Sequence, residues 1–133
     1  MPDVRGAYVE LHGTLGAGKT TFVRHLLGAL GVEGRVKSPT YALMEPYVVE
    51  PYGLSGFDAW HFDFYRFNDP QEFEDAGFRE VFSSPGLKLV EWPEKAAGLL
   101  PLADLIIAIA FAEDEQRTVT FSAQTPLGKS LLP

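Results

Sequence analysis

The pattern of apolar and polar positions at the start of the chain predicts a strand, a tight turn and a helix. Ala7–His12 is rich in bulky, β-prone side chains, which favours a strand. Gly13–Gly18 is a glycine-rich turn. Apolar residues then recur at helical spacing, which predicts a helix over Lys19–Leu30 that ends at Gly31, a residue typical of helix carboxyl-terminal caps.

The segment after the first helix has little regular pattern until an aromatic strand begins. Three prolines predict that Arg35–Tyr52 is a loop with short extended pieces. Aromatic residues then alternate along Trp60–Phe67, which predicts a strand. Its two faces are expected to carry Phe62 and Phe64 on one side and His61, Asp63 and Tyr65 on the other.

The second half of the chain predicts two short helices and three strands. Asp69 and Pro70 are typical of a helix start, with Glu72 completing a capping box, and the helix is expected to end near Asp75. A second short helix is expected around Phe78–Phe82. The strands are expected at Leu87–Trp92, at the almost wholly apolar Leu105–Phe111, and at the more polar Thr118–Ser122. The second strand suits burial on both faces and the third suits a sheet edge. Strands interleaved with helices predict an α/β fold with a largely parallel sheet.

Length and composition narrow the class of protein. The chain has 133 residues, which suits one compact domain over 1–133. It has no cysteine and no apolar run near the ~20 residues that cross a bilayer, and residues 1–5 lack the apolar core of a secretory signal. We therefore expect a cytoplasmic protein. The net charge of -7 argues against direct binding of RNA or DNA, which requires clustered lysine and arginine.

The turn before the first helix carries a phosphate-binding motif. Gly13-Thr14-Leu15-Gly16-Ala17-Gly18-Lys19-Thr20 matches the Walker A pattern G-x-x-x-x-G-K-[ST] at every fixed position. Glycines let the backbone wrap closely and aim its N–H groups at phosphate oxygens, and the helix dipole adds to the attraction. Lys19 is expected to contact the β and γ phosphates, Thr20 to ligate Mg²⁺, and Thr21 to reach the α phosphate. The motif predicts a nucleoside triphosphate site, with Mg-ATP as the expected ligand.

Hydrolysis requires further groups that order metal and water, and a loop segment and a strand end offer two candidates. Within Lys37–Tyr41, Thr40 can sense the γ phosphate from a switch loop, although the same residues are typical of a simple turn. In Leu89–Pro93, two apolar residues lead into Glu91, and ligands bind at the carboxyl ends of strands in open α/β sheets. Glu91 is therefore well placed for metal or water, or else faces solvent. Trp92 beside it is either a packing residue or a nucleotide contact.

The aromatic strand offers a third candidate. Asp63 at its end suits a Walker B acid, which holds Mg²⁺ directly or through water. A structural alternative is a hydrogen bond from Asp63 to Tyr65 or Arg66. His61 can act as a base, but a structural role is more common for a single histidine in a strand.

These segments together resemble the bacterial TsaE family, also known as YjeE. The resemblance runs from about Tyr8 to Phe121. The segments that carry it follow one another in the order Leu15–Phe22, Lys37–Tyr41, His61–Arg66 and Glu91–Glu94. The Walker element is shared by many proteins, whereas the Ser-Pro-Thr, His-x-Asp-x-Tyr-Arg and Glu-Trp-Pro elements together are far more specific.

The resemblance implies a P-loop NTPase-like fold, with a mostly parallel central sheet flanked by helices, and a weak ATPase activity. Members of the family are accessory subunits in the formation of N6-threonylcarbamoyladenosine at position 37 of tRNA. They act with TsaD and TsaB, of which TsaD performs the transfer to tRNA. ATP hydrolysis by the TsaE subunit is expected to reset the complex between rounds.

The resemblance also implies roles for single residues. Lys19 would contact the terminal phosphates, Thr20 and Glu91 would ligate Mg²⁺, Thr40 would be the sensor, Asp63 would orient water or metal, and Trp92 would lie close to the nucleotide. Further nucleotide contacts would come from Gly13, Leu15, Gly16, Ala17, Gly18 and Thr21. The chain before Gly13 is shorter than is usual in the family, and that segment normally lies near the base, so no residue is assigned to the adenine pocket.

Two other functions fit parts of the pattern. One is a nucleotide-gated binding protein, in which ATP switches affinity for a partner and hydrolysis is incidental. The other is a small-molecule kinase. Such kinases usually carry an arginine-rich lid, and Arg117 is the only arginine after Trp92, which disfavours this function.

Overall fold

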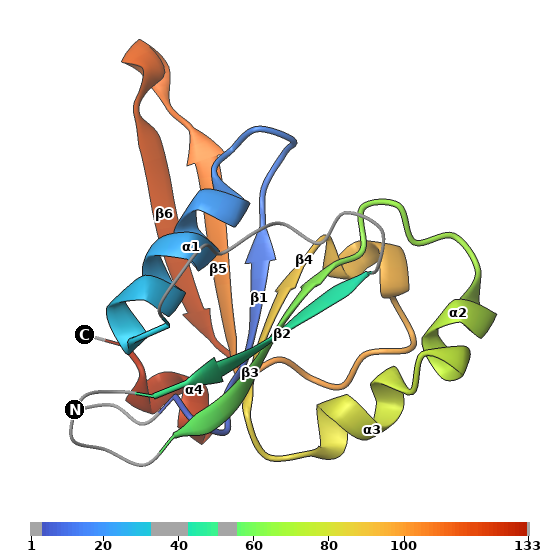
Figure 1. Ribbon diagram of the computed structural model, residues 1–133. Helices are drawn as coiled ribbons and strands as arrows, with labels where there is room; N and C mark the ends of the chain where they lie inside the picture. Colours follow the sequence, from blue (N-terminus) through green and yellow to red (C-terminus); the bar gives the residue numbers. More distant parts are fainter. Residues whose placement is uncertain (1–3, 33–42, 51–55, 133) are drawn as a thin grey trace.

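The computed structural model describes residues 4–32, 43–50 and 56–132. Six strands form one sheet in the order β2-β3-β4-β1-β5-β6, with helices on both faces (Figure 1). The strands are β1 Tyr8–His12, β2 Met44–Val49, β3 Phe57–Asp63, β4 Leu87–Glu91, β5 Leu105–Phe111 and β6 Arg117–Ala123. The helices are α1 Lys19–Leu30, α2 Pro70–Asp75, α3 Phe78–Ser83 and α4 Pro126–Ser130, and short 3-10 helices lie at η1 Pro93–Ala96 and η2 Glu113–Glu115.

The centre of the sheet is parallel and both of its edges are antiparallel. β3, β4, β1 and β5 pair in parallel, while β2 pairs antiparallel with β3 and β6 antiparallel with β5. The predicted α/β class with a largely parallel sheet is therefore confirmed. Because parallel strands place their carboxyl ends at one edge of the sheet, the segments that follow β1, β3 and β4 lie together.

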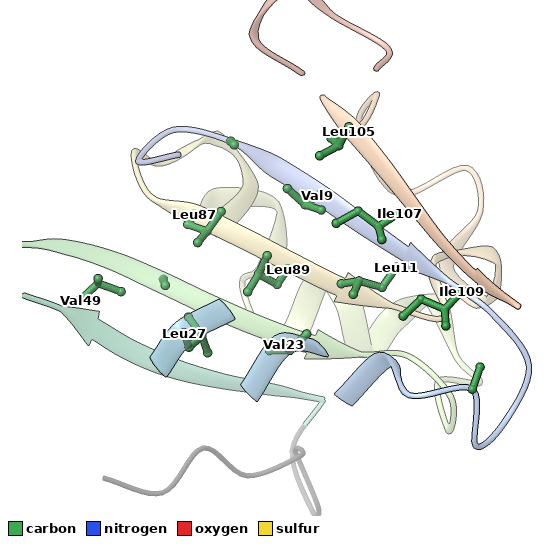
Figure 2. Close-up of a cluster of buried hydrophobic side chains, with 13 residues drawn as sticks. Val9, Leu11, Val23, Leu27, Val49, Leu87, Leu89, Leu105, Ile107 and Ile109 are labelled. Atoms are coloured by element: carbon green, nitrogen blue, oxygen red, sulfur yellow. The ribbon is translucent and has the colours of Figure 1, made fainter. Parts of the chain in front are cut away.

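Helix α1 covers one face of the sheet through an apolar stripe. Val23 and Leu27 are fully buried and belong to the same core cluster as Leu11 and Leu89 of the central strands (Figure 2). Burying a side chain of this size stabilises the fold by about 1.5–3 kcal/mol. The helix has the predicted bounds and ends at Gly31 in the left-handed conformation, with φ 109° and its N–H donating to the Gly28 carbonyl.

Helices α2 and α3 cover the opposite face with aromatic side chains. The cluster there contains Tyr8, Phe62, Phe64, Phe67, Phe73, Phe78 and Phe82. The Phe62 ring stacks on Phe82 with centroids 4.7 Å apart and meets Phe78 edge-on at 5.1 Å. Asp69 caps α2 as predicted, since its side chain accepts a hydrogen bond from the Gln71 N–H at 2.9 Å.

Two predictions in the middle of the chain were only partly correct. Residues 44–49, expected to lie in a loop with short extended pieces, form a complete edge strand, β2, and Pro46 is tolerated there because an edge strand does not need every N–H. The following strand was expected at 60–67 but spans 57–63. It ends at Asp63 because the Asp63 carboxylate accepts from the Tyr65 N–H at 3.0 Å and turns the chain away from the sheet.

The carboxyl-terminal strands extend beyond the part of the sheet that the helices cover. Leu105, Ile107 and Ile109 of β5 are buried, but the Phe111 side chain is 54% exposed. The expectation that this strand is buried on both faces was therefore wrong towards its end. β6 lies at the sheet edge, as predicted, and the β5–β6 hairpin projects past the glycine-rich turn (Figure 1). In the described ranges no helix is long and apolar enough to cross a membrane.

Candidate functional site

The glycine-rich loop, residues 13–20, joins the central strand β1 to α1. Gly13 has φ 157° and lies directly against β5, so that a Cβ atom there would be 2.6 Å from the Ile109 carbonyl oxygen. Gly18 precedes the first residue of α1 with φ 110°. Both positions therefore require glycine, for space at the first and for backbone conformation at both. With glycine at these two positions, the loop can cross the carboxyl end of the sheet close to β5.

A pocket of about 340 Å³ opens beside this loop. Its lining combines loop residues with side chains from the ends of β3 and β4 and from the start of β6. The lining residues are Leu15, Gly16, Gly18, Lys19, Thr20, Thr21, Asp63, Tyr65, Glu91, Trp92 and Arg117. Segments far apart in the sequence thus converge on the site.

A buried hydrogen-bonded chain runs from α1 through β4 to β3. The Thr20 hydroxyl lies 3.0 and 2.9 Å from the two carboxylate oxygens of Glu91. On the other side, His61 Nε2 lies 2.6 Å from Glu91 Oε2. Glu91 is only 2% exposed, so the alternative that it faces solvent is wrong. His61 is fully buried, and its polar contact is with an acid of the site.

Lys19 is buried in the loop and has two partners there. Its ammonium donates to the Gly13 carbonyl and lies 3.5 Å from the centroid of the Trp92 ring. Burial lowers the pKa of Lys19 below its usual value, and the negative charges of Glu91, Glu94 and Asp63 oppose that shift. The ammonium is held by a neutral carbonyl and an aromatic face, partners that an anion could replace.

Trp92 has an uncommon backbone conformation that sets its ring over the site. Its φ and ψ of 56° and 48° are left-handed, which is strained for an aromatic residue. The following Pro93 begins η1, and the Trp92 ring packs 5.0 Å from that of Tyr65. The packing role weighed for Trp92 is therefore confirmed, and because the residue also lines the pocket, its contact with a nucleotide stays a prediction.

For Asp63 the structural alternative, a hydrogen bond with Tyr65, is confirmed, and its role as a metal-holding acid stays a prediction. Its carboxylate accepts from the Tyr65 N–H, and it lines the pocket beside Glu91. Burial raises the pKa of Asp63, and the nearby Glu91 carboxylate raises it further. The backbone hydrogen bond and the charges of His61 and Lys19 act in the opposite direction. A carboxylate with a raised pKa is a better proton acceptor than one in water.

Most of the predicted site residues lie together. Lys19, Thr20, Thr21, Asp63, Glu91 and Trp92 all line the pocket, with Leu15, Gly16 and Gly18. Gly13 and Ala17 shape the loop without lining this pocket; Gly13 accepts from Lys19, and Ala17 is fully buried. Thr40 lies outside the described residues.

Two lining residues were not predicted as site residues. Arg117 lies at the start of β6 and reaches the pocket because its hairpin partner β5 pairs with β1, a contact between distant segments that no local motif signals. Tyr65 belongs to the aromatic segment that also carries Asp63, and its ring contact with Trp92 depends on the turn after β3. The alternation of that segment placed Tyr65 on the same side as Asp63 but gave no sign that it lies beside Trp92.

The fold and the site together define an α/β domain in which a glycine-rich strand-to-helix loop faces two acids from neighbouring strands. The family of the threonylcarbamoyl adenosine biosynthesis protein TsaE matches residues 3–119. The chain therefore belongs to the TsaE family.

Individual relatives agree with this assignment. The chain is 45% identical to the tRNA threonylcarbamoyladenosine biosynthesis protein TsaE of Haemophilus influenzae, across 93% of this chain and 75% of that protein. It is 38% identical to the protein of the same name from Bacillus subtilis, across 89% and 70%. The crystal structure of Bacillus subtilis YdiB matches with a TM-score of 0.73 and 31% identity, covering 94% of this chain and 73% of that one.

Proposed function

We propose that the chain binds Mg-ATP in this pocket and hydrolyses it slowly. The observation that carries the proposal is the convergence of four side chains around one cavity. Lys19 and Thr20 come from the glycine-rich loop, and Asp63 and Glu91 come from two other strands. A turn that only joined β1 to α1 would not require two acids beside it.

The loop suits a polyphosphate. Its backbone lies at the amino-terminal end of α1, where the helix dipole and free N–H groups favour anions. A phosphate oxygen would replace the Gly13 carbonyl and the Trp92 ring as partner of Lys19, with a stronger, charge-assisted hydrogen bond. The bound anion would also favour the charged form of Lys19, whose pKa burial lowers.

The pair Thr20 and Glu91 fits the ligand geometry of Mg²⁺. Mg²⁺ prefers oxygen ligands, and Thr20 Oγ1 and Glu91 Oε2 lie 2.9 Å apart, close enough for one ion to contact both. Mg²⁺ commonly takes one or two protein ligands and completes its shell with phosphates and water. We assign Thr20 and Glu91 as ligands, with Asp63 acting through water.

Asp63 is the residue proposed to orient the attacking water. Its raised pKa and its place at the pocket wall support that role. Thr40, from the segment outside the described residues, would sense the γ phosphate. Bound Mg²⁺ would neutralise charge that develops on the phosphates during transfer.

We further propose that this ATPase is an accessory subunit in tRNA threonylcarbamoyladenosine biosynthesis, beside TsaD-like and TsaB-like partners. Family membership and the names of the relatives support the pathway. The net charge of -7 favours contact with tRNA through those partners and not through this chain.

The test compares wild type with Lys19→Ala, Asp63→Ala and Glu91→Ala. ATP binding is measured by calorimetry, hydrolysis by phosphate release, and tRNA modification in a reconstituted complex with the two partners. We expect Lys19→Ala to lose binding, and the two acid variants to bind ATP but lose hydrolysis and repeated modification. Unchanged ATP affinity in Lys19→Ala would show that the site is wrongly assigned.

The same experiment separates a second candidate, the nucleotide-gated binding protein. Leu15 and Tyr65 line the pocket and are 68% and 43% exposed, so an occupant of the pocket would alter an apolar surface that a partner can contact. If Asp63→Ala and Glu91→Ala still support repeated modification without hydrolysis, gating by binding alone is the function.

A further inference from the structure

Strand β6 forms an exposed edge of the sheet. Within the described residues β5 is the one strand that pairs with it, and the hairpin stands clear of the helices towards its tip (Figure 1). Six of the seven residues of β6 are exposed. Charged side chains often protect such an edge from pairing with other chains, but here the charge is confined to the first residue, Arg117. Residues 118–123 therefore form an uncharged, β-prone edge that suits another strand.

The hydrogen bonds of the hairpin determine which backbone groups of β6 point outward. The Gln124 N–H donates to the Asp104 carbonyl at 2.9 Å, and the Ala112 N–H donates to the Gln116 carbonyl at 2.7 Å. The register between these two bonds is continuous, and alternate residues of an antiparallel strand point their backbone groups to the same side. The even-numbered residues therefore bond to β5. The residues whose N–H and C=O groups point away from the sheet are Arg117, Val119, Phe121 and Ala123.

The side chains of β6 make a pattern that is nearly the same in both directions. Val119 and Phe121 lie two residues apart and hence on one face, and they are 42% and 44% exposed. Small hydroxyl residues lie on the other face, at Thr118, Thr120 and Ser122. The order of apolar and polar positions is thus symmetric about Thr120. A symmetric contact between identical chains requires a surface that is complementary to itself, and this strand has that property.

We propose that β6 is the interface of a homodimer, in which it pairs antiparallel with β6 of a second copy across a two-fold axis at Thr120. Val119 of each copy then lies opposite Phe121 of the other, and these residues exchange the hydrogen bonds of their outward backbone groups. Four exposed apolar side chains come together on one face. The two sheets become one continuous sheet, and the exposed edge of each is covered by the other.

Charge complementarity at both ends of this interface favours a second copy as the partner. When the register is extended past the strand, Glu115 of one hairpin tip reaches the level of Thr125 in the second copy. Thr125 caps α4, which carries the exposed Lys129, and the acidic tip includes the exposed Glu113. Each acidic tip therefore approaches the basic end of the other copy. The net charge of -7 opposes many other contacts between two copies, whereas the uncharged residues 118–123 do not.

Single cysteines test the register, because the chain has none of its own. Residue 120 would lie opposite itself in a non-hydrogen-bonded pair, with Cα atoms about 4.5 Å apart, a distance that a disulfide spans. We expect Thr120→Cys to form a covalent dimer on mild oxidation. Thr118→Cys would lie about 13 Å from its own copy and should not cross-link alone. Mixed with Ser122→Cys, which lies opposite it, Thr118→Cys should cross-link.

Sedimentation equilibrium tests the association itself. An interface of one strand pair is small, and small interfaces are weak, so the concentration series extends to about 1 mM. The wild-type mass should rise from 14.7 kDa towards twice that value. Phe121→Lys places charges within the apolar contact and should keep the mass of one chain. Its matched control, Val48→Lys, makes the same kind of change at a 62% exposed apolar position of the opposite edge strand β2, and should associate like wild type.

Three outcomes would overturn the proposal. One is a wild-type chain that keeps the mass of a single chain throughout the series, which would leave β6 to a strand of a different protein or to none. Another is Phe121→Lys that associates as wild type does. The third is Thr118→Cys that cross-links alone as readily as Thr120→Cys. Thermal unfolding checks that each variant is folded, and the cysteine variants decide the question if Phe121→Lys is not.

Discussion

His61 Nε2 lies 2.6 Å from Oε2 of Glu91, and both side chains are buried. The Glu91 carboxylate also contacts the Thr20 hydroxyl, so it is held from two sides. Within the part of the chain that the structure describes, His61 Nδ1 has no hydrogen-bond partner. The hydrogen bond that the described residues give the His61 ring is therefore the one with Glu91. This contact fixes the direction in which the Glu91 carboxylate points.

This contact predicts that substitution of His61 changes the Mg²⁺ concentration that ATP hydrolysis requires. In His61→Ala, the Glu91 carboxylate loses a partner and its orientation, so the Mg²⁺ concentration for half-maximal ATP hydrolysis should rise by about 10–100-fold. His61→Gln keeps a side-chain N–H donor and should recover part of the loss. Thermal unfolding of both variants controls for folding. The same Mg²⁺ dependence in His61→Ala and wild type would rule out the positioning role.

The contact between the Lys19 ammonium and the Trp92 ring predicts a change in fluorescence when nucleotide binds. Tryptophan emission responds to a nearby ammonium, and the Lys19 ammonium lies 3.5 Å from the Trp92 centroid. Nucleotide binding should move that charge to phosphate and change the fluorescence. The chain has 2 tryptophans, which allows a matched control. We expect Trp60→Phe to keep the change and Trp92→Phe to lose it in a fluorescence titration with ATP; a change that survives in Trp92→Phe would contradict the contact.

Lys88 predicts a pH effect on stability away from the site. Its side chain is 4% exposed, contacts the Ser84 carbonyl, and lies 5.5 Å from the Trp60 ring centroid. Burial lowers the pKa of Lys88 below the usual 10.5, and the Asp104 carboxylate only partly opposes this. The unfolded chain then binds more protons at this position between the lowered pKa and 10.5, so the contribution of Lys88 to stability rises with pH across that window.

Lys88→Met removes the buried charge and should make the protein more stable than wild type at pH 7. The advantage should shrink as the pH approaches 10, where the wild-type lysine loses its charge. Urea unfolding of both proteins at several pH values measures the difference. An advantage that grew with pH would contradict the sign of the pKa shift.

Replacing glycine by alanine should have opposite effects on stability at Gly13 and at Gly28. Gly13→Ala would bring a Cβ to 2.6 Å from the Ile109 carbonyl oxygen at φ 157°, and should destabilise the fold by about 1–3 kcal/mol. Gly28→Ala lies in α1 with nothing within 4 Å of the added Cβ, and should stabilise by about 0.5–1 kcal/mol. Urea unfolding gives both values. A neutral Gly13→Ala would mean that the loop does not rest on β5.

Local chemistry made much of the fold predictable. The helix over 19–30, its end at Gly31 and the cap at Asp69 depend on neighbouring residues, and all were predicted correctly. Strand β2 was missed because Pro46 is typical of a loop, and only the position of this strand at the sheet edge makes it tolerable. Helix α4 was missed although Thr125 and Pro126 repeat the pattern of Asp69 and Pro70, because it is too short to show an apolar period.

The site residues likewise fall into those that local sequence predicts and those that depend on contacts between distant segments. Lys19 and Thr20 lie in a contiguous motif, and Glu91 ends an apolar strand, so each could be predicted from its own neighbours. The contact between His61 and Glu91 depends on parallel pairing of β3 with β4. Arg117 reaches the pocket because the β5–β6 hairpin pairs through β5 with β1. Pairings between distant segments leave no local pattern, and these are the parts that required a structure.

The contact between the glycine-rich loop and β5 has a consequence for how the protein folds during its synthesis. Gly13 lies against Ile109 of β5, and β1 pairs with both β4 and β5, which are far from it in the sequence. On the ribosome the glycine-rich segment emerges well before β5, the strand that supports it, and such long-range pairings slow folding in general. The segment must therefore wait in an unfinished shape until β5 has been made. A chain that stalled before residue 105 would carry the full motif without the wall that shapes it.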